Sequence, residues 1–223
     1  NITELVKNCG FGVFKGAADG GGSVRGITAK NAVKTYSRKE IDKLTEFVRG
    51  IGAKGLAWIR MTDDGIASSF AKFMSEEEMQ AILQKAGAQT GDVVFIIADT
   101  NNSHVLSALG ALRCEVAKRL DIIGEGYNFL WVVEFPFFEK DEETGEWVAM
   151  HHPFTSPTDE CLDKLEADKS KVYAKAYDMV LNGIELSSGS IRITNPELQN
   201  RMFRMLGPVS YTHLRAHETD SYL

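Results

Sequence analysis

Apolar residues in the first half of the chain recur at two periods, one helical and one typical of strands. Ser37 is followed three residues later by Glu40 and then by apolar residues at helical spacing, which is the pattern of a capped helix. Ser75 and Glu78 repeat that pattern, and a further amphipathic run covers 103–120. These signals predict three helices.

Short apolar runs between those helices predict strands over 11–15, 55–61 and 92–99. The last of them, DVVFIIAD, is apolar throughout, so we expect it to be buried on both faces. The glycines of 16–26 indicate a loop or a hairpin connection. Together these elements predict an α/β-type module over residues 1–122, in a chain that is α+β as a whole.

Beyond Gly124 the pattern changes to one of strands joined by turns and loops. The strongest local signal is Asn182-Gly183 between two apolar-rich runs, which predicts a hairpin closed by a type I′ turn. The expected segments, in chain order, are a strand over 129–138, a charged turn over 139–147, a proline-bounded loop over 151–157, a partly helical stretch over 159–175 and the hairpin over 177–193.

The predicted hairpin register decides which polar side chains share a face. Opposed residues share a face, and so do residues two apart along a strand, so Asp178 and Glu185 are expected together. Arg192 joins them only if a β-bulge lies within 187–190, where serine and glycine alternate. Without a bulge, the pairs are Leu181 with Ile184, Val180 with Glu185, Met179 with Leu186 and Asp178 with Ser187.

Diagonal neighbours on one sheet face are about 7–8 Å apart at Cα, and two carboxylates at that separation can share a divalent ion. The guanidinium of arginine suits the binding of a carboxylate or a phosphate. The plain alternative is a solvated strand face with a surface Glu–Arg pair, which contributes little to stability. The adjacent His151 and His152 are either a feature of the loop or, for His151 with Asp178 and Glu185, the start of a metal-hydrolase site. From the pattern alone these alternatives stay open.

Other features of the sequence indicate structure more than chemistry. Trp58 and Trp131 lie in apolar strands and are expected in the core. The glycine-rich stretch at 16–26 lacks the spacing of a phosphate-binding loop. A modest basic cluster suits either a solvated helix face or a tRNA contact; it consists of Lys30, Lys34, Arg38, Lys39 and Lys43.

Composition narrows the class of protein. The 223 residues are 43% hydrophobic and 25% charged, with a net charge of −6, which is typical of a globular protein and unfavourable for bulk electrostatic binding of nucleic acid. No run reaches ~18 uncharged apolar residues, so no membrane partner is expected. Cys9, Cys114 and Cys161 are far apart, which argues against a disulfide framework or a structural zinc site and favours a reducing, cytoplasmic location.

Both ends of the sequence look cut. The chain begins with Asn1 and its first residues are typical of the middle of a domain. Residues 209–223 have no apolar period and look like the translation of a sequencing adapter, so we expect this tail to be an artefact. Its His213 and His217 are therefore not counted as metal ligands.

The second half carries a resemblance to a known family. FLWVVEFPFFEKDEETGEWVAMHHPFTSP, followed by AYDMVLNGIELSSGSIRI, closely resembles the bacterial type of aspartyl-tRNA synthetase, and the 34-residue step from His151 to Glu185 fits. NITELVK and the module after it resemble the inserted GAD domain of that enzyme, which is related to a domain of the tRNA-dependent amidotransferase. The resemblance covers about residues 1–207. It implies a GAD insertion domain over 1–122, with about the first 10 residues belonging either to it or to the catalytic domain. It also implies part of a class II catalytic domain, an antiparallel sheet with flanking helices, over 123–208.

The resemblance also implies roles for the polar residues. His151 would contact the aspartate substrate, with His152 assisting, and Arg192 would grip the substrate's side-chain carboxylate. Glu185, with Asp178 nearby, would handle ATP and magnesium. The family commonly has GGGS where this chain has Ser187-Ser188-Gly189-Ser190.

The implied activity is ATP-dependent formation of aspartyl-adenylate and transfer of aspartate to tRNA(Asp) by a homodimeric enzyme. The anticodon-binding barrel, the dimer-forming motif and two ATP-binding motifs are missing from the sequence, so we expect this polypeptide alone to be inactive and to expose apolar sheet surface. The alternative is a non-catalytic tRNA-contacting or scaffold protein built on a GAD-like module, which would have no need of the Asp178, Glu185 and Arg192 constellation.

Overall fold

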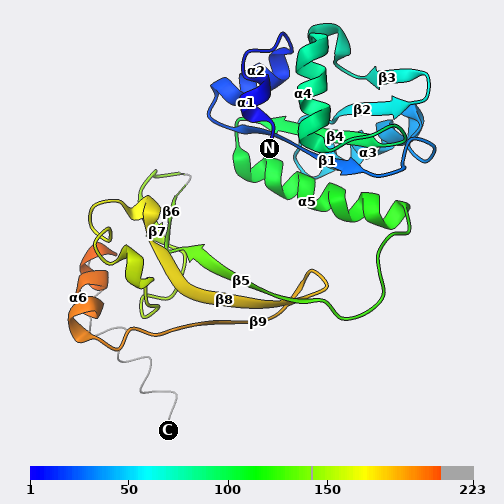
Figure 1. Ribbon diagram of the computed structural model, residues 1–223. Coiled ribbons are helices and arrows are strands. Elements are labelled where there is room, and N and C mark those ends of the chain that lie inside the picture. Colours follow the sequence, from blue (N-terminus) through cyan, green and yellow to red (C-terminus); the bar gives the residue numbers. More distant parts are fainter. Residues whose placement is uncertain (142, 207–223) are drawn as a thin grey trace. The chain divides into compact units, whose positions relative to one another are not determined.

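The computed structural model describes residues 1–141 and 143–206, and the chain divides into two compact units at Gly124 (Figure 1). The tail expected to be an artefact, 209–223, lies outside the described residues. The first unit contains, in chain order, α1 (Thr3–Val6), α2 (Gly12–Asp19), β1 (Ser23–Ala29), α3 (Arg38–Gly50), β2 (Ala57–Thr62), β3 (Gly65–Ser68), the 3-10 turn η1 (Ala71–Phe73), α4 (Glu76–Ala86), β4 (Val93–Asp99) and α5 (Asn102–Arg119).

The first unit is a three-layer arrangement around a four-stranded antiparallel sheet in the order β1-β4-β2-β3. Alternate side chains of β4 enter two separate cores, one with α3 and α5 and the other with α1, α2 and α4 (Figure 1). Phe95 lies in the first core and Ile96 in the second. This double burial explains why the sequence of β4 is apolar at every position, as predicted.

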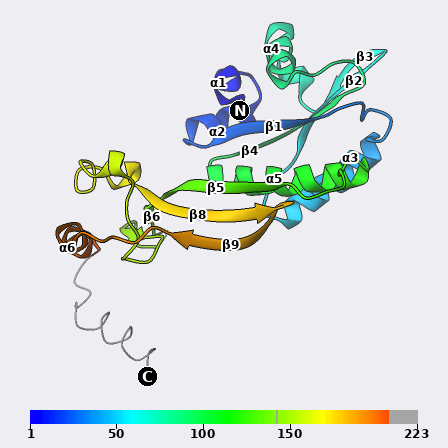
Figure 2. The same cartoon turned by 60° about the horizontal axis from the view of Figure 1, so that its bottom comes forward.

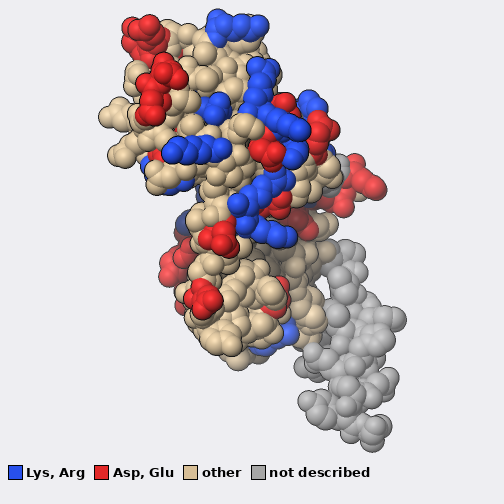
Figure 3. All heavy atoms as spheres, turned by 90° about the vertical axis from the view of Figure 1, so that its right-hand side faces the viewer, with Lys and Arg blue, Asp and Glu red and all other residues tan. Residues whose placement is uncertain are grey.

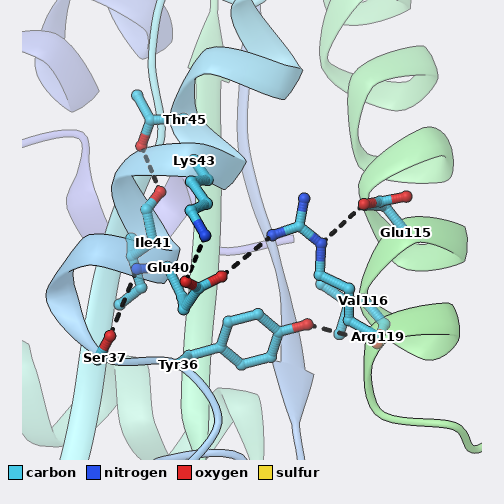
Figure 4. A network of polar contacts seen from close by, with 9 residues as sticks. All are labelled: Tyr36, Ser37, Glu40, Ile41, Lys43, Thr45, Glu115, Val116 and Arg119. Carbon is cyan, nitrogen blue, oxygen red and sulfur yellow. Dashed lines mark hydrogen bonds and ion pairs between the residues drawn. The ribbon is translucent and has the colours of Figure 1, made fainter.

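The three helices predicted for this unit are present as α3, α4 and α5, and both predicted caps are confirmed. Ser37 accepts a hydrogen bond from the backbone N–H of Glu40, and Ser75 and Glu78 form a complete reciprocal capping box. The carboxylate of Glu40 does not complete a box; it pairs with Lys43 at 2.6 Å and reaches Arg119 of α5 at 3.8 Å (Figure 4).

Two predictions for the start of the chain are wrong. Residues 12–15 form the first part of α2, with Phe11 at its N-cap, instead of a strand. Of the stretch 16–26, predicted as a loop or hairpin connection, only residues 20–22 connect α2 to β1. The reason is tertiary: Phe14 and Ala17, three residues apart, both enter the core, which a helix permits and a strand does not. A run of five residues is too short to show this period.

The second unit contains β5 (Phe129–Pro136), β6 (Phe138–Lys140), β7 (Trp147–Ala149), the 3-10 turns η2 (Asp159–Cys161) and η3 (Lys169–Lys171), β8 (Tyr173–Leu181), β9 (Ile184–Ser190) and α6 (Pro196–Met205). β5, β8 and β9 form one antiparallel sheet in that order, and β6 pairs with β7 (Figure 2). All pairings in both units are antiparallel, which confirms the α+β class and places the first unit outside the α/β type.

The β8–β9 hairpin has the predicted turn and a shifted register. Asn182 and Gly183 have φ angles of +50° and +84°, as a type I′ turn requires. Val180 lies opposite Glu185 as predicted, but Met179 lies opposite Ser187. The bulge therefore falls at Leu186, before the serine–glycine stretch where the sequence analysis placed it.

The three-stranded sheet exposes much of its apolar surface, as expected for part of a larger sheet. Trp131 is 59% exposed, so the prediction that it is a core residue is wrong, whereas Trp58 packs against the core of the first unit. Apolar strand composition does not show whether a further layer covers the strand. Among the helices of residues 1–141 and 143–206, none is both long enough and apolar enough to cross a bilayer.

Candidate functional site

A cavity of about 390 Å³ lies on one face of the second unit, and all five predicted site residues line it. It lies between the strands β8 and β9 and the loop 151–157. The residues that line it are His151, His152, Asp178, Glu185 and Arg192, together with Phe135, Thr155, Ala176, Ser188, Gly189 and Ser190.

The bulge at Leu186 is what brings Arg192 to this face. Asp178 and Val180 share a face of β8, and Glu185 lies opposite Val180. The extra residue on β9 then reverses the alternation, so that Ser188 lies opposite Asp178 and Arg192 follows on the same side. The sequence prediction was correct that a bulge is needed and misplaced it by one or more positions.

Backbone hydrogen bonds fix the histidine loop against β9. The N–H of Ser156 donates to the carbonyl of Ile191 at 2.8 Å, and the N–H of Ile193 donates to the carbonyl of Phe154 at 2.8 Å. Thr155 forms an isolated bridge with Arg192, and its hydroxyl lies 3.2 Å from that of Ser190. The loop therefore has a defined position relative to the two carboxylates and the arginine.

The two histidines have different environments. His151 lies edge-on to Phe135 and Phe137, with ring centroids 5.7 and 6.3 Å away, and its Nε2 atom is buried without a hydrogen-bond partner among the described residues. Nδ1 of His152 accepts a hydrogen bond from the backbone N–H of Phe154 at 3.2 Å. His151 thus offers an unused polar atom, and His152 also stabilises the turn of the loop.

The carboxylates of the site form a pair and not a larger cluster. Within residues 1–141 and 143–206, no group of three or more His, Cys, Asp or Glu side chains is arranged to hold a metal ion. The two carboxylates remain, and a pair of carboxylates is a common protein contribution to a magnesium ion that also binds substrate phosphates.

Sequence reasoning missed the residues between the charged groups. Ser188 and Ser190 alternate on the cavity side of β9, and Thr155 faces them from the loop. The alternation of serines after the turn was visible in the sequence. The contribution of Thr155 was not, because it depends on the bridge between the loop and Arg192.

The basic cluster of the first unit has acidic partners within it. Lys30 pairs with Asp92 at 2.8 Å, and Lys43 pairs with Glu40 at 2.6 Å. On the face of the molecule drawn in Figure 3, basic and acidic side chains are interspersed. Because opposite charges cancel over short distances, these two pairs favour a solvated helix face over a tRNA contact for Lys30 and Lys43.

The first unit has a recognisable domain signature. The profile of the GAD domain matches residues 14–109. The match runs from the middle of α2 to the middle of α5, so it contains the whole four-stranded sheet.

Comparison with curated proteins extends the similarity beyond the GAD domain. An aspartate–tRNA ligase of Ruminiclostridium cellulolyticum is 57% identical over 209 residues, which are 93% of this chain and 35% of the relative. An aspartate–tRNA ligase of Clostridium botulinum (strain Kyoto) is 52% identical over 224 residues, covering 100% of this chain and 37% of the relative. The aspartate–tRNA(Asp/Asn) ligase of Lachnoclostridium phytofermentans is 50% identical over 225 residues, which cover 100% of this chain and 37% of the relative.

The chain is homologous to a part of aspartate–tRNA ligase. It spans 35 to 37% of the length of these curated relatives. The similarity covers both the GAD domain and the unit that carries the candidate site, so the resemblance seen in the sequence motifs is confirmed.

Proposed function

We propose that this chain is the part of an aspartate–tRNA ligase that selects aspartate and holds it for activation. In the whole enzyme, a carboxylate oxygen of aspartate attacks the α-phosphorus of ATP, the bond to the bridging oxygen breaks, and pyrophosphate leaves. The product is aspartyl-adenylate, and a hydroxyl of the terminal ribose of tRNA(Asp) then takes the aspartyl group as AMP leaves. The observation that carries this proposal is the cavity in which Arg192, His151 and the Asp178–Glu185 pair converge.

Arg192 is the specificity residue of this proposal. Its guanidinium would bind the side-chain carboxylate of aspartate through two parallel hydrogen bonds. An asparagine amide carries no charge and offers one acceptor, so it would leave the guanidinium poorly paired. No acidic side chain forms an ion pair with Arg192 among the described residues, which keeps this group available for a ligand.

Asp178 and Glu185 fit the magnesium that ATP brings. Both carboxylates line the cavity, and their shared face follows from the hairpin register. Mg²⁺ held there would offset charge on the phosphates.

His151 would hydrogen-bond the aspartate through Nε2. That atom is buried and unpartnered among the described residues, and a bound polar group would remove the cost of its burial. His152 lies at the same cavity but already accepts a backbone hydrogen bond, so we assign it the smaller, assisting role.

The remaining parts of the proposal concern the whole enzyme. It acts as a homodimer in the cytoplasm, binds tRNA(Asp), aspartate and ATP, and needs residues beyond this chain for tRNA and for most of the ATP contacts. The exposed apolar face of β5, including Trp131, is consistent with a sheet that is completed by other strands.

The test is aspartate-dependent exchange of pyrophosphate into ATP. The full-length protein that contains this sequence is expected to catalyse it, and Arg192→Ala is expected to abolish it. The 223-residue chain alone is expected to show none. Undiminished exchange by Arg192→Ala would overturn the assignment, and absence of exchange in the full-length protein would favour the tRNA-contacting scaffold.

A further inference from the structure

A second cavity lies inside the first unit, away from the residues discussed so far. Its volume is about 610 Å³, within the range of roughly 300–1,000 Å³ typical of small-molecule sites. It lies where β4 ends, between the first turns of α2 and the end of α3. Its apolar wall contains Phe11, Val13, Phe14, Ala17, Leu56, Ala57, Ile96 and Ala98.

One buried carboxylate lines this cavity. The side chain of Asp99 is 5% exposed, and its Oδ1 atom accepts hydrogen bonds from the N–H of Asn101 at 2.9 Å and the hydroxyl of Thr100 at 3.3 Å. Its Oδ2 atom is buried and accepts no hydrogen bond from the described residues. The only charge near Oδ2 among them is the ammonium of Lys54, at 3.1 Å.

The cations at this cavity are far more exposed than the carboxylate. The side chain of Lys54 is 70% exposed and that of Arg49, paired with Glu46, is 55% exposed. Both line the cavity. Gly12 and Val13 of the first turn of α2 also line it, and that helix has no side-chain cap, so its positive end is available to an anion.

We propose that this cavity binds an apolar α-amino acid as a zwitterion. An α-amino acid carries an ammonium and a carboxylate on one carbon, which matches a carboxylate and an ammonium 3.1 Å apart on the wall. The ligand's ammonium donates a hydrogen bond to Oδ2 of Asp99. The ligand's carboxylate forms an ion pair with Lys54 and lies at the N-terminus of α2. The apolar side chain enters the space beside Phe14, Leu56 and Ile96.

The ion pair between Lys54 and Asp99 supports this assignment. Lys54 compensates the buried carboxylate until the ligand arrives, and because most of its side chain is in solvent, it can turn to the ligand without disturbing the core. The hydrogen bond from the N–H of Asn101, followed by the pairing with Lys54, lowers the pKa of Asp99, so this carboxylate stays ionised at neutral pH.

The test is titration of the 15N-labelled 223-residue chain with L-phenylalanine and L-leucine, followed by amide NMR shifts and calorimetry. Binding with shifts confined to the cavity is expected. Phenethylamine lacks the carboxylate and 3-phenylpropanoate lacks the ammonium, so each should bind at least ~10-fold more weakly. Excess L-aspartate should not displace the ligand, which separates this site from the one proposed for aspartate.

Two variants and a control complete the experiment. Lys54→Gln changes an exposed side chain and should weaken binding of the zwitterion by at least ~5-fold without weakening that of phenethylamine, whose ammonium no longer competes with Lys54 for Asp99. Gly16 lines the cavity and a Cβ there meets nothing within 4 Å, so Gly16→Leu should fill the space and abolish binding. Gly110→Leu on α5 is the matched control, because Gly110 is equally open and lies outside the cavity.

Three results would overturn the proposal. These are no shift at ligand concentrations well above about 1 mM, equal binding of the zwitterion and its two truncated analogues, or full binding by Gly16→Leu.

Discussion

Met179 lies opposite Ser187, one residue beyond the partner that regular alternation would give it. Leu186 is the extra residue, and it returns the following part of β9 to the face that Asp178 and Glu185 occupy. Because a one-residue slip turns every later side chain to the other face of a sheet, this single bulge decides whether Arg192 reaches the cavity.

Deleting Leu186 and Ser187 together tests the geometry of the site. Deleting Leu186 alone removes the extra residue and keeps Ser188 opposite Asp178, so Arg192 should stay at the cavity and activity should be retained. Deleting both residues leaves an odd number of steps from Glu185 to Arg192, so in the full-length protein Arg192 should turn to the opposite face and aspartate-dependent pyrophosphate exchange should fall at least ~100-fold. A double deletion as active as the single deletion would show that the register does not position Arg192.

Replacing Arg192 by lysine tests bidentate recognition. Lysine keeps the charge and loses the planar fork, so the KM for aspartate should rise ~100-fold or more, with a much smaller change in the KM for ATP. Arg201→Lys is the control, because Arg201 binds Glu166 through two bonds of 2.9 and 2.8 Å outside the cavity. An equal rise in both Michaelis constants would contradict a role specific to aspartate.

Asp92 should be a strong contributor to the stability of the first unit. Its side chain is 4% exposed and accepts hydrogen bonds from Lys30 at 2.8 Å and from the N–H groups of Asn31 and Gln89, each at 2.9 Å. Asp92→Ala should lower the free energy of unfolding by about 2–4 kcal/mol, because it leaves buried donors unpaired. Urea denaturation followed by Trp58 fluorescence, with Trp131 and Trp147 replaced by phenylalanine, measures it.

Asp19→Ala provides the comparison, since its pair with Lys15 is exposed and should contribute less than about 1 kcal/mol. Equal destabilisation by the two variants would show that burial of Asp92 is not what matters.

The same unit should lose stability in acid. Burial alone would raise the pKa of Asp92, but the bonds from Lys30, Asn31 and Gln89 outweigh it, and the pKa lies below its ordinary value, as does that of Asp99. The unfolded chain then binds protons at a higher pH than the folded one. Stability should be constant above the ordinary pKa, near pH 4, and fall as the pH drops through the folded-state values.

Urea midpoints measured between about pH 6 and pH 2 test this pH dependence. The double variant Asp92→Asn, Asp99→Asn should show a shallower decline over that range than the natural chain. An unchanged slope in the double variant would assign the acid sensitivity to other carboxyl groups.

The hairpin turn gives a further stability prediction. Gly183 has a φ of +84°, which costs an L-residue strain, so Gly183→Ala should destabilise the second unit by about 1 kcal/mol. Gly110→Ala, inside α5 with open space around it, should stabilise the first unit by about 0.5–1 kcal/mol. Urea denaturation of both variants should give changes of opposite sign in the free energy of unfolding. An unchanged free energy of unfolding for Gly183→Ala would contradict the strain argument.

The sequence by itself determined the elements whose signals are local. The caps at Ser37 and Ser75, the uninterrupted apolar strand of β4 and the type I′ turn at Asn182-Gly183 each depend on residues within a few positions of one another. These signals need no distant partner, and the structure has all of them. The choice of His151, Asp178, Glu185 and Arg192 also came from the sequence, through the resemblance of its motifs to aspartyl-tRNA synthetases.

Only the tertiary structure decided where those elements pack and what their side chains meet. Residues 12–15 became a helix because Phe14 and Ala17 share a core, and Trp131 is exposed because no described layer covers β5. The position of the bulge depends on pairing between two strands, and the bridge from Thr155 to Arg192 depends on a loop far away in the chain. Contacts between distant residues carry these decisions, and a local pattern does not contain them.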